Sequence, residues 1–211
     1  MNNRFDDYIN RLTKNLSKPL PGMDAQYKMA PVTRKDQLVY NNNDFPPKES
    51  AVLALLYPEN NEIMLVLIKR ASDNSVHSGQ ISFPGGQAEP SDKNATDTAL
   101  RETEEEIGID RNKITVIGKL SEVYISPSNF NVIPFVGFMN EKPSFNPNEE
   151  VDRVITTAIS YLKTPEAKTI KKVTTAYAVN LEAPCFIVEG ETLWGATAMM
   201  INELLEVDNI Q

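Results

Sequence analysis

Apolar positions along the chain follow two spacings, and each spacing predicts a different kind of element. In residues 6–16 the apolar side chains recur every three or four positions, which indicates an amphipathic helix. Helical patterns also predict helices at 95–107 and from about 196 to 207. Short apolar runs bounded by turn-forming residues predict strands, and these lie at 51–57, 63–69, 80–83, 114–123, 132–139, 153–159, 177–181 and 185–188.

The order of these elements indicates the fold class and the domain boundary. Residues 51–57 and 63–69 flank a polar, turn-forming stretch, so they predict a mostly buried hairpin. Strands outnumber helices and alternate with them irregularly, which favours an α+β or mixed-sheet sandwich. A proline-punctuated stretch runs from 18 to 47. We therefore expect residues 1–45 to form an N-terminal helix and connector that pack on a domain of residues 46–211.

Length, charge and cysteine content narrow the class of protein. The chain has 211 residues and a mass of 23.6 kDa, which suits one large domain. Its formal net charge of −8 disfavours a nucleic-acid partner, because binding a phosphate backbone needs a surplus of Lys and Arg. The single cysteine fits a reducing compartment, and the longest apolar runs are far below the roughly 20 residues that span a bilayer. The N-terminus also lacks the apolar stretch of a secretory signal. We therefore expect a cytoplasmic protein without a membrane partner, and a homodimer is compatible with these features.

The helix expected at 95–107 gathers carboxylates near its end. Glu102, Glu105 and Glu106 stand at positions i, i+3 and i+4, so their side chains share one face. Gly108 is placed for a left-handed cap that ends the helix, and a neighbouring face can pack on the core through Ala99, Leu100, Thr103 and Ile107. Each like-charge pair costs about 0.2–0.5 kcal/mol on a helix surface. The cluster is therefore either a solvated acidic face or a site for a hard divalent cation such as Mg²⁺ or Mn²⁺.

A glycine pair upstream favours the cation site. Gly85 and Gly86 follow the strand expected at 80–83 and precede the loop into the acidic helix. Glycine at such a point lets the backbone approach a ligand or a helix closely. Ordinary turns often contain Gly-Gly, but its combination with the Arg-Glu and Glu-Glu pairs of residues 101–106 is much rarer. We therefore favour the metal site over the solvated face.

These residues resemble the Nudix box, whose pattern is Gly, five residues, Glu, seven residues, Arg-Glu, an aliphatic residue, any residue, Glu-Glu, any residue, Gly and an aliphatic residue. The matching positions are Gly86, Arg101, Glu102, Glu105, Glu106, Gly108 and Ile109. Asp92 takes the place of the first Glu, and Thr103 takes the place of the first aliphatic residue. Residues 87–100 form a spacer one residue longer than the pattern, so we expect this loop to bulge by one residue.

Segments outside the box resemble the coenzyme A pyrophosphatase branch of the Nudix superfamily. Residues 67–70 and 77–86 are similar to the motif that precedes the box in that branch, and His77 falls on its histidine. Ser75 stands where the motif carries a basic residue. The resemblance continues downstream at 126–127, 132–136 and 193–198.

The resemblance implies a fold, a cofactor and roles for individual residues. The implied fold is an α/β/α sandwich with a mixed β-sheet between helices, and the implied cofactor is Mg²⁺ or Mn²⁺. Glu102 and Glu106 are implied as the principal metal ligands, and Glu105 as a further ligand or the group that orients water. The implied catalytic residues are Arg101, Glu102 and Glu105. The implied substrate-binding residues are Lys69, Arg70, His77, Gly85 and Gly86.

A later loop offers one more acidic residue. Relatives often add a carboxylate from such a loop as a ligand or base, and Glu149 and Glu150 precede the strand expected at 153–159. The alternative for both residues is an ordinary exposed loop, where charged side chains are common.

The implied substrate is coenzyme A or a derivative, hydrolysed at its diphosphate to 3′,5′-ADP and 4′-phosphopantetheine. ADP-ribose or another nucleoside diphosphate conjugate is the alternative, because Ser75 replaces a basic residue of the motif. A non-catalytic nucleotide-sensing module is a third reading, and the presence of Glu102, Glu105 and Glu106 counts against it. In each case the partner is a small nucleotide.

Overall fold

The computed structural model describes residues 3–31, 46–72, 78–174 and 180–210. The strands of its main sheet are β1 (Lys48–Glu59), β2 (Glu62–Arg70), β3 (Ile81–Ser82), β4 (Gly85–Gln87), β5 (Thr115–Lys119), β6 (Val123–Ile125), β7 (Phe130–Phe138) and β8 (Val151–Ala158). They run in the order β3-β2-β1-β7-β5, with β4 paired to β1, β6 to β7 and β8 to β2. A smaller sheet is formed by β9 (Lys168–Val173), β10 (Leu181–Val188) and β11 (Glu191–Trp194).

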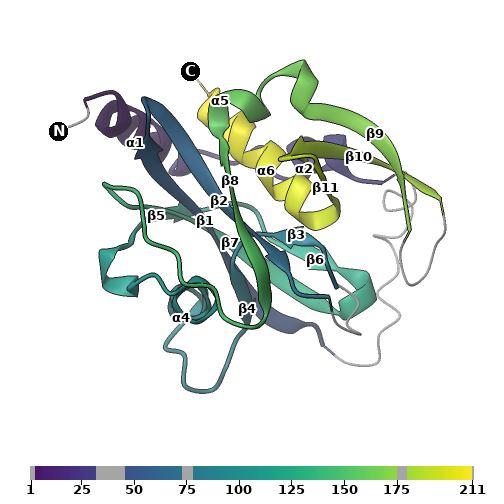
Figure 1. Ribbon diagram of the computed structural model, residues 1–211, viewed down its shortest axis with the longest axis horizontal. Coiled ribbons are helices and arrows are strands. Elements are labelled where there is room, and N and C mark those ends of the chain that lie inside the picture. The colour runs from purple at the N-terminus through teal and green to yellow at the C-terminus, as the bar shows by residue number, and fades with distance from the viewer. Residues whose placement is uncertain (1–2, 32–45, 73–77, 175–179, 211) are drawn as a thin grey trace.

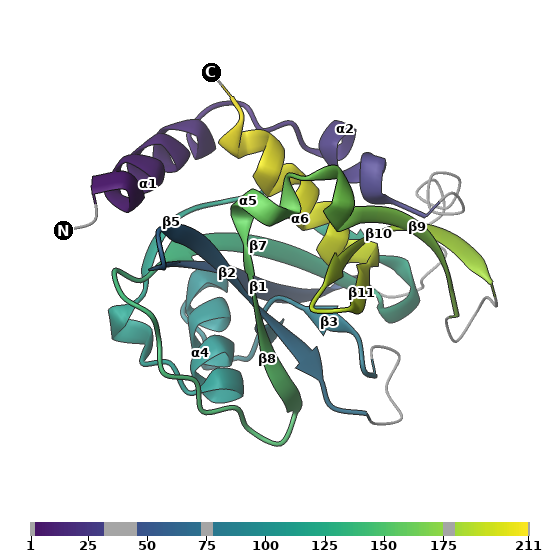
Figure 2. The ribbon, with the colours of Figure 1, turned by 45° about the horizontal axis from the view of Figure 1, so that its top comes forward.

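Helices cover both faces of the main sheet. They are α1 (Asn3–Leu16), α2 (Met23–Gln26), α4 (Ala95–Ile107), α5 (Ile159–Leu162) and α6 (Gly195–Asp208), and short 3₁₀ turns are η1 (Tyr27–Met29), η2 (Arg111–Lys113), η3 (Ser126–Ser128) and η4 (Pro165–Ala167). Helix α4 lies on one side of the sheet, and α1 and α6 lie on the other together with the smaller sheet (Figures 1 and 2). The expected arrangement of a mixed sheet between helices is therefore confirmed. None of the helices in the described ranges has the length and hydropathy needed to cross a bilayer.

Strand β1 is apolar from Ala51 to Tyr57, where it is buried on both faces. It pairs in parallel with β7 and antiparallel with β2 and β4, which makes the sheet mixed. Successive side chains of a strand point to opposite faces. One set therefore joins the core beneath α4, namely Ala51, Leu53, Leu55 and Tyr57. The other set joins the core shared with α1 and α6, namely Val52, Ala54 and Leu56.

Most predicted elements are found, and the differences have identifiable causes. Helix α4 matches the prediction at both ends, whereas the strand expected at 114–123 is wrong in extent, since β5 ends at Lys119 and β6 begins at Val123. The chain leaves the ladder between them, and the Ser121 N–H donates to Glu203 instead of to a strand. The strand expected at 177–181 lies mostly outside the described residues. Strand β9 was not predicted at all, and the boundary at residue 45 stays a prediction.

Glu203 links three segments that are distant in the sequence through hydrogen bonds inside the protein. The residue is fully buried in the middle of α6. Its Oε1 accepts hydrogen bonds from the backbone N–H groups of Gly22 and Ser121, both at 3.2 Å. Its Oε2 accepts one from Nε2 of Gln26 at 2.8 Å. Glu203 therefore fixes the segment around α2 and the turn after β5 to α6.

Glu203→Gln is expected to lower the free energy of unfolding by about 1–3 kcal/mol, because an amide NH₂ would then face donors that now bind an oxygen. Urea unfolding midpoints at pH 7 would measure the change. Glu166→Gln is the matched control, since Glu166 is exposed in η4, and it should change the stability by less than about 0.5 kcal/mol. Equal midpoints for the two variants would contradict a linking role for Glu203.

Candidate active site

The acidic helix α4 begins and ends where its local sequence dictates. The Asn94 side chain caps the first turn by accepting from the Asp97 N–H at 3.0 Å. Gly108 takes the left-handed conformation with φ of 71°, and its N–H donates to the Glu104 carbonyl. The face expected to pack on the core does so, and its buried or partly buried members are Ala99, Leu100, Thr103 and Ile107. The neighbouring carboxylate face is thereby turned toward β4.

The glycine turn of β4 lies directly against two carboxylates of α4. The Gly85 N–H donates to Oε2 of Glu106 at 2.8 Å. A Cβ atom built on Gly86 would lie 2.6 Å from the carboxyl carbon of Glu102. Glycine at position 86 therefore leaves room for the carboxyl group of Glu102, which occupies the space of a side chain. The turn and the helix form one unit, as the combined motif predicts.

Glu106 is a buried carboxyl group with few compensating partners. Its side chain is 2% exposed and lies 3.2 Å from the guanidinium of Arg70. The pKa of Glu106 is raised to about 7, mainly by burial. The charges of Glu102 and Glu150 add to the rise, whereas the Gly85 hydrogen bond and Arg70 oppose it. Three carboxylates are thus close enough to disfavour one another's charge, which a bound cation would relieve.

Arg101 holds the loop before α4 and two of its carboxylates. It forms a two-point ion pair with Asp92 at 2.8 and 3.0 Å, and it donates to the Gln87 carbonyl at 3.2 Å. Its Nη1 also lies 3.0 Å from both Glu102 and Glu105. Burial raises the pKa of Glu102, and Arg101 opposes that rise. Asp92 thus fills the acidic position of the box as a partner of Arg101, despite the one-residue difference in loop length.

The raised pKa of Glu106 predicts how the stability of the protein in a metal chelator changes with pH. Folding moves this pKa from 4.5 to about 7, so between these values the folded state keeps a proton that the unfolded state releases. The free energy of unfolding therefore falls as the pH rises through this range, by about 3 kcal/mol from this group. Glu106→Gln removes the effect. Its melting temperature relative to the unsubstituted protein should rise between about pH 5 and pH 8 in EDTA, and a constant difference would contradict the assignment.

Glu149 and Glu150 are both exposed loop residues, and Glu150 is the one that approaches the site. A backbone contact places Glu150 near α4, since the Asn148 N–H donates to the Glu106 carbonyl at 3.0 Å. The Glu150 carboxylate then lies 3.9 Å from the guanidinium of Arg70. The sequence did not distinguish these two glutamates as candidates for the site, because the hydrogen bond that places Glu150 there joins segments far apart in the chain.

Of the expected substrate-binding residues, Arg70 is brought to the carboxylate cluster and Lys69 is not. The Lys69 ammonium lies 2.8 Å from Glu191 at the start of β11 and 3.9 Å from Asp152. Neighbouring residues of a strand face opposite sides of a sheet, which explains the separation. Arg153 also binds Glu191, at 3.1 Å. His77 lies outside the described residues, so its role stays a prediction.

Sequence reasoning missed Ser50, which supports the glycine turn. The Ser50 hydroxyl donates to the Gly86 carbonyl at 2.7 Å. Its position in β1, opposite Gln87 of β4, has no local sequence signal, since it depends on pairing between distant strands. Ser50 therefore belongs to the scaffold that holds the turn against α4.

The donor set suits a hard divalent cation, although it is not preassembled. Within the described residues, no three acidic, histidine or cysteine side chains already stand in the arrangement of a metal cage. Glu102, Glu106 and Glu150 nonetheless influence one another's charge, and carboxylate oxygens with added water and phosphate are what Mg²⁺ and Mn²⁺ prefer. A cation would reduce the repulsion between these carboxylates and the cost of burying their charge. The residues present therefore fit such an ion.

Comparison with known proteins finds relatives of this chain. The family model described as NUDIX domain matches residues 47–175. Nudix hydrolase NudL of Yersinia enterocolitica is 33% identical over 149 residues, which cover 71% of this chain and 76% of that protein. Nudix hydrolase 15, mitochondrial, of Arabidopsis thaliana is 43% identical over 104 residues, which cover 49% of this chain and only 36% of the plant protein.

The fold is shared with a solved structure. The crystal structure of MutT protein from Methanosarcina mazei Go1 superimposes with a TM-score of 0.53 at 17% sequence identity. The matched region covers 80% of this chain and 99% of that one. At this identity the likeness concerns the fold, with the mixed sheet enclosed by helices.

Proposed function

Because the chain belongs to the NUDIX domain family, we propose that it is a divalent-metal-dependent hydrolase of the diphosphate in coenzyme A or its derivatives. The products are 3′,5′-ADP and 4′-phosphopantetheine, formed when water adds across the P–O–P linkage. The observation that carries the proposal is the contact of the Gly85-Gly86 turn with the carboxyl groups of Glu102 and Glu106. This contact explains the glycines and the glutamates of the motif together.

We assign metal binding to Glu102 and Glu106, with Glu105 as a further ligand or the group that orients water. Burial of the first two supports the assignment, because buried carboxylates without sufficient cations are costly. Glu105 is about half exposed, so its carboxylate faces solvent water as well as Arg101. When bound, the cation neutralises phosphate oxygens and lowers the pKa of water.

Two arginines contribute without being ligands. Arg101 is a positioning residue, since its contacts with Asp92 and Gln87 fix the loop between the glycine turn and α4. Arg70 lies between Glu106 and Glu150. In the proposed reaction its guanidinium stabilises charge on the diphosphate, for which a fixed array of N–H donors is suited.

Coenzyme A is proposed as the substrate because of residues flanking the box. Residues 67–70 and 77–86 resemble the motif of the coenzyme A branch, including His77. ADP-ribose or another nucleoside diphosphate conjugate is the second candidate, favoured by Ser75 at the motif's basic position. Both candidates use the same carboxylates, so only the group beyond the diphosphate differs.

A substrate panel tests the proposal. The value of kcat/KM would be measured with Mg²⁺ or Mn²⁺ for coenzyme A, an acyl-coenzyme A, ADP-ribose and a dinucleoside polyphosphate, and products would be identified by mass spectrometry. We expect coenzyme A or its acyl derivative to exceed the others by at least about tenfold, a difference of 1.4 kcal/mol in transition-state binding. A higher value for ADP-ribose would favour the second candidate, and no hydrolysis of any member would contradict the proposed class.

A further inference from the structure

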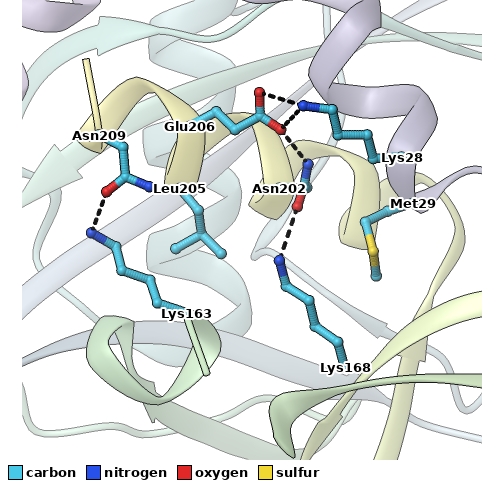
Figure 3. A pocket seen from close by; sticks show the side chains of 8 residues that line it. All are labelled: Lys28, Met29, Lys163, Lys168, Asn202, Leu205, Glu206 and Asn209. Carbon is cyan, nitrogen blue, oxygen red and sulfur yellow. Dashed lines mark hydrogen bonds and ion pairs between the residues drawn. The ribbon is translucent and has the colours of Figure 1, made fainter. Parts of the chain in front are cut away.

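A pocket lies on the opposite side of the main sheet from α4. It has a volume of about 280 Å³ and runs along the C-terminal half of α6. Helix α6 packs in the core on its own face of the sheet, and α4 packs in the other, so the pocket is remote from the acidic site (Figure 2). Figure 3 shows the lining residues, which are Lys28, Met29, Lys163, Lys168, Asn202, Leu205, Glu206 and Asn209.

Three lysines line this pocket from separate elements. Lys28 comes from η1, Lys163 follows α5, and Lys168 begins β9 (Figure 3). Glu206 is the single acidic residue of the lining. Three positive charges against one negative charge give the lining a formal charge of +2, in a chain whose net charge is −8. Asp208, which binds Lys163 from outside the lining, offsets part of this charge. This local reversal of charge favours an anion.

Donors remain for a ligand after the internal contacts are counted. The Lys168 ammonium bonds Oδ1 of Asn202 at 3.4 Å and lies 5.5 Å from the Phe186 ring centroid. The Lys163 ammonium donates to Asp208 and to Oδ1 of Asn209. Since an ammonium carries three N–H groups, each of the two lysines has at least one more hydrogen bond to give.

An anion in the pocket would have to compete with the ion pair between Lys28 and Glu206, which is exposed. Lys28 binds Glu206 at 2.9 Å, and their side chains are 62% and 31% exposed. Exposed ion pairs contribute little to stability, so Lys28 can turn from Glu206 to an anion at little cost, while Glu206 keeps the hydrogen bond from Nδ2 of Asn202 at 2.9 Å.

The base of the pocket, by contrast, is fixed. Asn202 is 4% exposed and donates to the Ala25 carbonyl at 2.8 Å. Met29 and Leu205 are also buried there. The pocket therefore combines a rigid floor with lysines that can turn toward a ligand.

We propose that this pocket binds the phosphate group of a small free molecule, a phosphate monoester or inorganic phosphate. Lysine binds phosphate as a point charge, and the volume suits a small ligand. The net charge of −8 disfavours approach to an anionic membrane surface, so a free molecule is the occupant. The bound phosphate links η1, α5 and β9 across α6, and it thereby stabilises the N-terminal segment on the domain.

Inorganic phosphate is the probe that tests this site. With ionic strength held constant by NaCl, 10 mM phosphate should raise the melting temperature by about 3 °C if binding is millimolar. Lys168→Gln should remove most of this rise. Lys172→Gln is the matched control, since Lys172 is exposed on the same strand and outside the pocket lining, and it should retain the rise.

NMR locates the binding without relying on stability. The side-chain amide signals of Asn202 and Asn209 should shift during phosphate titration of the unsubstituted protein, and less so in Lys28→Gln. Equal melting shifts in Lys168→Gln and Lys172→Gln would overturn the proposal. Shifts confined to the backbone amides of Gly85 and Gly86 would also overturn it, because they would place phosphate at the acidic site instead.

Discussion

Glu106→Gln is expected to lower the rate of diphosphate hydrolysis by roughly 10²–10⁴ while the protein stays folded. Glutamine keeps the size of the side chain, and its carbonyl oxygen can still accept from the Gly85 N–H, which now lies 2.8 Å from Oε2. The negative charge is lost, however, and with it the interaction that we assign to the metal. Steady-state kcat with saturating substrate and cation, together with a thermal melt, measures both parts of the prediction.

Glu104→Gln provides the control on the same helix. Glu104 pairs with Arg111, at 2.7 Å, on the face away from the glycine turn. Its loss should change kcat by less than about twofold, since exposed ion pairs contribute little. Near-normal turnover in Glu106→Gln would remove Glu106 from the mechanism, and equal losses in both variants would point to a general effect of charge.

Alanine substitutions at the two neighbouring glycines are expected to have different effects, on stability at Gly85 and on activity at Gly86. A Cβ on Gly85 would lie 2.4 Å from the Ala51 carbonyl oxygen and 2.5 Å from Cα of Val52, and its φ of 145° disfavours any side chain. Backbone atoms of a central strand cannot move aside. Gly85→Ala should therefore lower the free energy of unfolding by about 4 kcal/mol or more, and the melting temperature by about 10 °C.

Gly86→Ala should instead spare the fold and impair the site. Its Cβ would lie 2.6 Å from the carboxyl group of Glu102, which is the mobile end of a side chain and can move away. Displacing that carboxylate by an ångström or more should reduce kcat by about 10²-fold. Circular dichroism melts and steady-state kinetics on both variants would show the contrast. Full activity in Gly86→Ala would mean that the present position of Glu102 is not needed.

The sequence predicts elements best where their signals are local. Helix α4 is found at its expected bounds because its apolar spacing and the cap at Gly108 are local signals, and in the structure Asn94 caps its other end. The Glu102 and Glu106 pair follows from helical spacing in the same way. Strand β9 has no such signal, since its Lys168-Thr169-Ile170-Lys171-Lys172 sequence is charged and exposed. It is a strand only because β10 pairs with it.

Features that depend on distant contacts could not be predicted. Glu150 reaches Arg70 through a backbone hydrogen bond from Asn148 to α4, and this bond leaves no trace in the local pattern. Lys69 is a different case. Alternation along a strand separates it from Arg70, so its place away from the carboxylate cluster follows from the sequence, and its role in substrate binding stays a prediction.

Isothermal titration of the purified protein with magnesium or manganese chloride tests the central claim most directly. The account predicts measurable uptake of the cation near pH 8, where Glu106 is ionised, and affinity at least about tenfold weaker in Glu106→Gln. Glu104→Gln should bind as the unsubstituted protein does. Absence of cation binding to the unsubstituted protein, both alone and with a non-hydrolysable diphosphate present, would contradict the account.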